Sequence, residues 1–341
     1  MKTLIINTQG AMGDLLLSTP IAEAIHRNFP GSSVYYWANP RFTPLLENHP
    51  YIQGVLDMPV KVPFGEGWRN LKSLGFDAVI SPWSKSREAW MSAFARIPIR
   101  VGQGGRLSYS FLYTHPVTIK SLHGDTHTHW VDILLDYARA LKCDVTGLRP
   151  FVTLTEAERA EGRAFWQSLP APEKRPRVIL QVCKGLPVTA DRWPLDVFIQ
   201  AGKTLIEQGC MIALTGLASE KHLMDEVEAK LDSASVINTA GRFALRQAAA
   251  VIAASDVVIC PDTGTGHLGA ALDVPVVSIF ALKCEVPLRW HPFVTPYRII
   301  RPDPIRCDLK CCKETCPRFS CLLDVDPESV AQAALEIAKK Q

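Results

Sequence analysis

Short apolar segments alternate with segments of helical periodicity along this chain, and the alternation begins twice. Strands separated by helices are typical of βαβ units, which build parallel sheets. The sequence therefore predicts an α/β protein with two doubly wound, Rossmann-like domains that face each other across a cleft. The apolar segments expected to be strands are residues 4–7, 34–37, 78–81, 178–182, 211–215, 236–238, 257–260 and 276–280.

The point where the alternation restarts indicates a domain boundary. A length of 341 residues suits two domains, each able to bury its own core. A helix expected over 156–169 is followed by residues 170–177, a linker rich in proline and charge. We therefore expect an N-terminal domain of residues 1–165, whose first helix covers 15–29, and a C-terminal domain of residues 170–341.

Composition excludes several classes of protein. The apolar N-terminus is too short for a signal peptide, and the apolar run 248–260 is interrupted by Ser255 and Asp256, so no transmembrane segment is expected. A formal net charge of +3 gives no indication of nucleic-acid binding. We expect a cytoplasmic protein whose ten cysteines are mostly reduced thiols.

The loop after the first predicted strand, residues 8–14, contains two glycines and ends at Asp14. Small residues such as Gly13 let backbone N–H groups approach a ligand, and the helix that follows adds its positive end. The loop lacks both the third glycine of a dinucleotide fingerprint and the lysine of a P-loop. Asp14 has two interpretations, a helix-capping residue or a general base at the mouth of the cleft.

A second loop of small residues follows the predicted strand 257–260. A strand, a small-residue turn and a helix can hold an anion through main-chain and hydroxyl donors. Two threonines, two glycines and a histidine exceed what a tight turn requires, so we expect a diphosphate site here. The residues are Asp262, Thr263, Gly264, Thr265, Gly266 and His267.

With these loops, the chain resembles the ADP-heptose lipopolysaccharide heptosyltransferases, glycosyltransferase family 9, which have the GT-B fold. The N-terminal signature corresponds to residues 10–14 with Leu16, Thr19 and Pro20, and the C-terminal one to residues 262–272. Further motifs fall in the family's order along nearly the whole chain. They are Pro40-Arg41-Phe42, Pro50-Tyr51, Arg100-Val101-Gly102, His129 and Arg192-Trp193-Pro194.

The resemblance implies an inverting transfer from ADP-heptose that requires no metal and no further cofactor. Asp14 matches the base that deprotonates the acceptor hydroxyl, and residues 263–266 match the diphosphate site. Glu220 matches the acidic residue that reaches the ribose, although a solvated glutamate in a first helical turn is an equal alternative. The N-terminal domain would bind the acceptor and the C-terminal domain the nucleotide sugar.

One departure from the family concerns the phosphate side of the donor site. The family carries a lysine two residues before the Trp-Pro pair, and this chain has Asp191 there. A carboxylate would repel a diphosphate, so another cation must take that role. Lys184 and Arg192 are the candidates for it.

A local excess of positive charge indicates an anionic acceptor. The resemblance implies the Kdo-lipid A core at the inner face of the cytoplasmic membrane, and arginine suits such phosphates and carboxylates. Neighbouring aromatic side chains can contact sugars or acyl chains, or can simply pack in the core. The basic residues are Lys85, Arg87, Arg96, Arg100, Arg106 and Lys120, and the aromatic ones are Trp83, Trp90, Tyr109, Phe111 and Tyr113.

A cysteine-rich segment precedes the last predicted helix. Its spacing is not that of paired metal knuckles, and no metal ligand is assigned, although a cluster of thiolates can hold zinc or iron. The cysteines are Cys307, Cys311, Cys312, Cys316 and Cys321. Three alternatives stay open: a protein-directed heptosyltransferase, a catalytically silent nucleotide-binding protein, and a Rossmann oxidoreductase, which the missing fingerprint disfavours.

Overall fold

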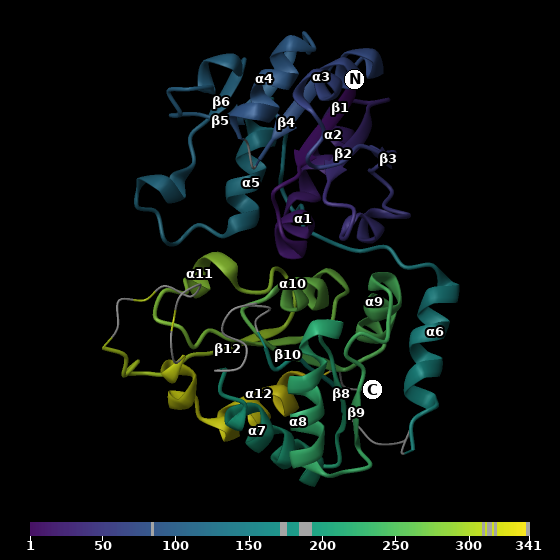
Figure 1. Ribbon diagram of the computed structural model, residues 1–341, viewed down its shortest axis with the longest axis vertical. Helices are drawn as coiled ribbons and strands as arrows, with labels where there is room; N and C mark the ends of the chain where they lie inside the picture. Colours follow the sequence, from purple (N-terminus) through teal and green to yellow (C-terminus); the bar gives the residue numbers. More distant parts are fainter. Residues whose placement is uncertain are drawn as a thin grey trace. The chain divides into compact units, whose positions relative to one another are not determined.

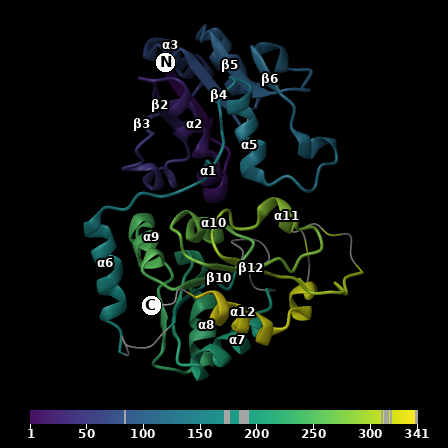
Figure 2. The same ribbon diagram turned by 180° about the vertical axis from the view of Figure 1, so that it is seen from behind.

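The computed structural model contains two compact units, Met1–Thr153 and Leu154–Gln341, here called the first and the second unit. It describes residues 1–82, 85–170, 176–183, 193–308, 311, 316 and 319–338. Each unit is a parallel six-stranded sheet with helices on both faces (Figures 1 and 2). The predicted α/β class with two doubly wound sheets is therefore confirmed.

The sheet of the first unit has the strand order β3-β2-β1-β4-β5-β6. Helices α1, α2 and α5 pack together, while α3 packs on α4, which lies against β4 and β5. The strands are β1 (Lys2–Asn7), β2 (Ser33–Ala38), β3 (Gly54–Val55), β4 (Ala78–Ser81), β5 (Ile99–Gln103) and β6 (His115–Val117). The helices are α1 (Met12–Ser18), α2 (Pro20–Asn28), α3 (Phe64–Leu74), α4 (Ser86–Phe94) and α5 (Trp130–Arg139), with short helices η1 (Thr43–Leu46), η2 (Ser110–Leu112) and η3 (Lys120–His123).

The second unit repeats this plan with the order β12-β11-β10-β7-β8-β9. Helices α7, α8 and α12 pack in one group and α6, α9 and α10 in another. The strands are β7 (Arg177–Leu180), β8 (Met211–Leu214), β9 (Val236–Asn238), β10 (Val257–Pro261), β11 (Val276–Ile279) and β12 (Tyr297–Ile300). The helices are α6 (Glu156–Gln167), α7 (Asp196–Glu207), α8 (Lys221–Leu231), α9 (Leu245–Ala253), α10 (Gly264–Ala271), α11 (Pro287–Trp290) and α12 (Pro327–Ile337), with η5 (Ala218–Glu220) and η6 (Ser320–Asp324).

The single helix expected over 15–29 is wrong, because the structure has two helices there. Helix α1 ends at Ser18 and α2 begins at Pro20, with Thr19 between them. Proline has no backbone N–H and favours the first position of a helix, so Pro20 starts a new helix. Helix α1 is therefore a short element that carries Asp14 close to its beginning.

Both sheets have a topological switch point, the pair of strands where the strand order reverses. In the first unit the chain proceeds outward from β1 and returns to place β4 on the other side of β1. In the second unit β7 and β10 are related in the same way. Doubly wound sheets bind ligands outside the carboxyl ends of the strands at such points. The loops after β1, β4, β7 and β10 are therefore the places to look for a site.

Helix α6 belongs to the second unit because it packs closely on α9. The indole nitrogen of Trp166 donates to the carbonyl of Val251 at 3.0 Å. A Cβ atom on Gly162 would lie 2.1 Å from the carbonyl oxygen of Ala250, so only glycine allows this approach. The boundary between the compact units therefore lies before α6. The boundary between the predicted domains, 1–165 and 170–341, lies near the end of α6.

An ion pair between α6 and α9 gives a pH-dependent prediction. Arg246 binds the carboxylate of Glu158, whose side chain is 20% exposed, and lowers the pKa of Glu158 to about 2. This stabilisation is complete above the ordinary carboxyl pKa and disappears as the pH falls toward 2. We expect Glu158→Gln to lower the stability by roughly 1 to 3 kcal/mol at neutral pH and much less near pH 2. Thermal unfolding midpoints of both proteins across this pH range test it, and a constant difference would contradict it.

Candidate functional site

The loop after β1 places the carboxylate of Asp14 at the switch point of the first unit. Asp14 is the third residue of α1, and its Oδ2 accepts a hydrogen bond of 2.8 Å from the amide of Ala11. The structure therefore contains the capping contact that was one interpretation of Asp14. This contact also fixes the carboxylate on a half-buried helix start, which suits a positioned base.

Gly10 and Asn7 determine the shape of this loop. A Cβ atom on Gly10 would lie 2.2 Å from Oδ1 of Asn7 and 2.8 Å from Cβ of Asp14, so no larger residue fits. The Asn7 side chain, at the end of β1, donates to the carbonyl of Asp14 at 3.1 Å and to the hydroxyl of Ser18 at 3.2 Å. The predicted site residue Gly13 is buried as the second residue of α1.

Glu88 is a polar residue of this site that the sequence analysis did not select. It lies in the first turn of α4, after β4, and is 1% exposed. Its Oε1 accepts from the hydroxyl of Thr8 at 3.4 Å, and its Oε2 has no partner among the described residues. Lys85 donates to the side chain of Gln9 at 2.6 Å. The loops after β1 and β4 therefore meet through side chains, and applying the switch-point rule to β4 would have found Glu88.

The loop after β10 leads directly into α10, at the switch point of the second unit. Thr263 precedes the helix, and its hydroxyl donates to Oε1 of Gln181 at 2.7 Å instead of capping α10. Gln181 follows β7 and is 9% exposed. The Thr263 side chain therefore makes no capping hydrogen bond to α10, and the amide of Gly266 donates to the carbonyl of Thr263 at 3.2 Å. Such a helix start suits an anionic ligand.

Two glycines bring α10 into direct contact with the sheet. A Cβ atom on Gly266 would lie 3.0 Å from the sulfur of Cys260, and one on Gly269 would lie 3.1 Å from Val258. These contacts fix the helix closely against β10 and β11. The predicted site residues Gly264, Thr265 and Gly266 therefore share one rigid helical turn.

His267 is buried in α10, with 7% of its surface exposed. Burial lowers its pKa, although the nearby Asp262 carboxylate opposes this effect. Its Nδ1 has no hydrogen-bond partner among the described residues. Burial therefore favours the neutral form of this side chain, whose Nδ1 is enclosed in the protein.

Glu220 lies after β8, buried at the end of η5. Its Oε2 accepts from the amide of Leu217 at 2.7 Å, which anchors the carboxylate to its own loop. Because Glu220 is buried, it is not a solvated helix residue. Its burial does not by itself indicate a contact with a nucleotide. Its role toward a ribose stays a prediction.

Three residues of the predicted donor site lie outside the described part of the chain, so the structure does not test them. They are Lys184, Asp191 and Arg192.

The cysteine-rich segment packs on the core of the second unit. Cys321 is buried in that core and Cys307 and Cys316 pack against it, while the sulfur of Cys311 accepts from the amide of Cys284 at 3.2 Å. Within the described ranges no three His, Cys, Asp or Glu residues are grouped so that they could hold a metal ion. Cys312 lies outside those ranges.

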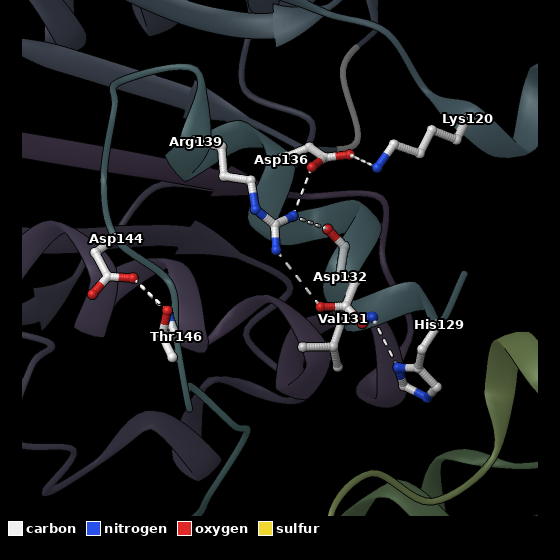
Figure 3. A network of polar contacts seen from close by, with 8 residues as sticks. All are labelled: Lys120, His129, Val131, Asp132, Asp136, Arg139, Asp144 and Thr146. Atoms are coloured by element: carbon white, nitrogen blue, oxygen red, sulfur yellow. Dashed lines mark hydrogen bonds and ion pairs between the residues drawn. The ribbon is translucent and has the colours of Figure 1, made fainter. Parts of the chain in front are cut away.

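Some of the residues expected at an acceptor site have structural roles instead. Figure 3 shows Lys120 and Arg139 on either side of the Asp136 carboxylate, at 3.3 and 2.6 Å. The guanidinium of Arg100 donates to the carbonyls of Ile97 and Leu112. His129, a residue of the family pattern, accepts from the amide of Val131 at 3.1 Å and so caps α5 (Figure 3).

The aromatic residues of the same stretch divide into two groups. Tyr109 and Tyr113 are buried beside Ala89, so they belong to the core of the first unit. Trp90 and Phe111 are exposed, and Trp83 lies outside the described residues. The expected acceptor surface therefore retains the basic residues Lys85, Arg87, Arg96 and Arg106 and two of the five aromatic ones.

Comparison with known proteins agrees with this geometry. Residues 65–319 match the family model described as glycosyltransferase family 9 (heptosyltransferase). Lipopolysaccharide heptosyltransferase 2 of Salmonella typhimurium is 27% identical over 294 residues, covering 82% of each chain. Lipooligosaccharide heptosyltransferase 2 of Haemophilus ducreyi is 28% identical over 290 residues, covering 81% of each.

The fold also matches a solved structure. ADP-heptose LPS heptosyltransferase II of Escherichia coli superposes with a TM-score of 0.80 at 23% identity, over 99% of this chain and 98% of that one. The two doubly wound units are thus the GT-B fold that the sequence motifs implied.

Proposed function

The chain belongs to glycosyltransferase family 9, and from that premise we propose that it transfers heptose from ADP-heptose to an anionic acceptor in the inner core of lipopolysaccharide. It is a glycosyltransferase, as the motifs predicted. Its relatives from Salmonella and Haemophilus act, by their names, as heptosyltransferases of lipopolysaccharide and lipooligosaccharide.

The start of α10 is the observation that carries this proposal. The Thr263 hydroxyl is bonded to Gln181 and does not cap the helix, so it leaves the start of α10 open to a ligand on that side. A diphosphate there would gain main-chain hydrogen bonds and the favourable end of the helix dipole. The same donors would stabilise the negative charge that develops as ADP leaves.

Asp14 is the proposed base of the reaction. Its carboxylate takes the proton of the acceptor hydroxyl while that oxygen forms a bond to the anomeric carbon of the heptose. The bond from that carbon to the diphosphate oxygen breaks, and ADP leaves with the bonding electrons. Attack opposite the leaving group inverts the configuration of the sugar.

The remaining donor contacts are proposed from their positions. Glu220 is held after β8 by the amide of Leu217 and would bond the ribose through its other oxygen. Neutral His267 would bond the donor near the diphosphate. Lys184 and Arg192 are the proposed cations in place of the family lysine.

The acceptor is proposed to bind the first unit. Lys85 donates to the side chain of Gln9, so a cation contacts the loop that leads to the proposed base. Arg87, Arg96 and Arg106 supply further positive charge, which suits phosphates and carboxylates. No helix among the described residues is long and apolar enough to span a bilayer. We propose a cytoplasmic enzyme that reaches its acceptor at the inner membrane surface.

The alternatives have weaker support. A protein-directed heptosyltransferase would act on a different class of acceptor from the one that the matched relatives' names state. A catalytically silent protein would not need the carboxylate that Ala11 holds in place. A Rossmann oxidoreductase disagrees with the family to which the chain belongs.

A panel of nucleotide sugars tests the donor. A ligand that binds only the folded state increases the free energy of unfolding, by about 2.7 kcal/mol at a ligand concentration of a hundred times its Kd. The thermal midpoint rises as a result. We expect ADP-heptose and ADP to raise the midpoint and UDP- and GDP-sugars to leave it unchanged. A shift with UDP- or GDP-sugars alone would overturn the proposed donor.

A further inference from the structure

The first unit carries a connected row of aromatic rings at its surface, which we call the aromatic ridge. Phe64 contacts Phe94, Phe94 contacts Trp90, and Trp90 contacts Phe111, with ring centroids 5.7, 5.9 and 5.8 Å apart. Trp68 adds a fifth ring, 6.3 Å from Phe94. The ridge is continuous across three elements that are distant in sequence, α3, α4 and η2.

The ridge contains all the exposed aromatic side chains of the described residues. Phe111 is 68% exposed, Phe94 52%, Phe64 39% and Trp90 36%. Helices α3 and α4 pack side by side (Figure 1). The ring contacts of Phe94 with Phe64 and Trp68 join the rings of the two helices. A contiguous apolar surface of this kind indicates an interaction site, because single exposed apolar residues need no partner but a cluster does.

Basic residues border the ridge. Residues 61–113 contain eight Lys and Arg against three Asp and Glu. Of these three acids, Glu88 is buried, while Glu66 and Asp77 are exposed, so the exposed positive charge of this stretch still exceeds the exposed negative charge. The guanidinium of Arg69 lies over the Trp68 ring, 5.6 Å from its centroid.

Two further residues extend this border. Arg96 is exposed immediately after α4. Arg106 is also exposed and precedes Leu107, whose side chain is 100% exposed in the turn before η2. Aromatic rings flanked by Arg and Lys are typical of surfaces that insert at the lipid headgroup level of an anionic bilayer.

We propose that the aromatic ridge docks the first unit onto an anionic lipid bilayer, with the rings entering the headgroup region and the basic border facing lipid phosphates. The proposal rests on the proposed function only in that a lipid-linked acceptor makes such docking useful. A second copy of the chain fits less well, since pairing this surface with itself would bring two positive borders together.

Sedimentation of the full chain with lipid vesicles tests the docking. Vesicles of phosphatidylcholine are compared with vesicles that also contain phosphatidylglycerol. We expect binding to the anionic vesicles, weakened by salt, and at least about tenfold weaker binding of the Phe64→Ser/Phe94→Ser protein, because two rings no longer enter the lipid. The matched control is Val294→Ser/Leu323→Ser, which alters residues 60% and 59% exposed in the second unit and should bind as the wild type does.

Two further measurements separate the possible outcomes. Turnover with a lipid-free Kdo oligosaccharide should be the same in the wild type and in both variants, so a failure of transfer in all three would refute the proposed function and not the docking. Equal vesicle binding by the ridge variant and the control would overturn the docking. Absence of vesicle binding, together with a dimer in sedimentation velocity that the ridge variant loses, would assign the surface to self-association instead.

Discussion

Asp14→Asn is expected to lower kcat for heptose transfer by about 10² to 10⁴, the usual contribution of a general base. Asparagine has the shape of aspartate, and its side-chain oxygen can still accept from the amide of Ala11, so the start of α1 should keep its structure. It cannot take a proton from the acceptor hydroxyl. Binding of ADP-heptose, measured by calorimetry, should be unchanged because the proposed donor site lies on α10 and not on α1.

Glu158→Gln is the matched control for this change. Glu158 occupies the same third position of α6 and accepts from the amide of Thr155 at 2.8 Å, as Asp14 does from Ala11. It has no proposed part in the reaction, so its replacement should leave kcat unaffected. If kcat for Asp14→Asn is close to that of the wild type, Asp14 is only a capping residue and the proposed mechanism is wrong.

Gly264→Pro is expected to lower kcat by about 10² to 10³, the cost of losing one donor to a developing negative charge. Gly264 is the first residue of α10, a position where proline fits and removes only an amide that the helix does not use. Thr263 before it is extended, with φ of −144° and ψ of 168°, as a residue before proline requires. The helix should therefore form normally with one fewer phosphate donor.

Gly264→Ala completes this comparison, because alanine also restricts the backbone but keeps the amide. It should bind ADP nearly as the wild type does, whereas the proline variant should bind it about 10- to 100-fold more weakly, as expected for a lost bond to a charged group. Equal ADP affinities in the two variants would show that the diphosphate does not lie at the start of α10.

The central strands of both sheets were predictable because they are buried on both faces and read as uninterrupted apolar runs. Strands β3, β5, β6 and β12 were not predicted. β3 has two residues, β6 contains Pro116, and β5 and β12 carry Arg100 and Arg298. Edge and near-edge strands need less apolar sequence, so their pairing depends on neighbours that are far away in the chain.

The two loops of the site were predictable from their glycines and their position after strands. The partners that shape them were not, because Glu88 meets Thr8 across 80 residues and Gln181 meets Thr263 across 82. Gln181 gave a weak signal as a polar residue in the apolar run 178–182. Such contacts follow from the strand order, which local sequence does not specify.

The close seating of α10 on the sheet through Gly266 and Gly269 has a consequence for divergence within the family. A homologue could keep every residue of the proposed diphosphate site and acquire alanine at either glycine. Its helix would have to rise by a few tenths of an ångström, because the added methyl would meet Cys260 or Val258 at 3.0 to 3.1 Å. Nucleotide binding would then change although the residues of the proposed site were the same. Whether a homologue has the same activity should therefore be judged from Gly266 and Gly269 as well.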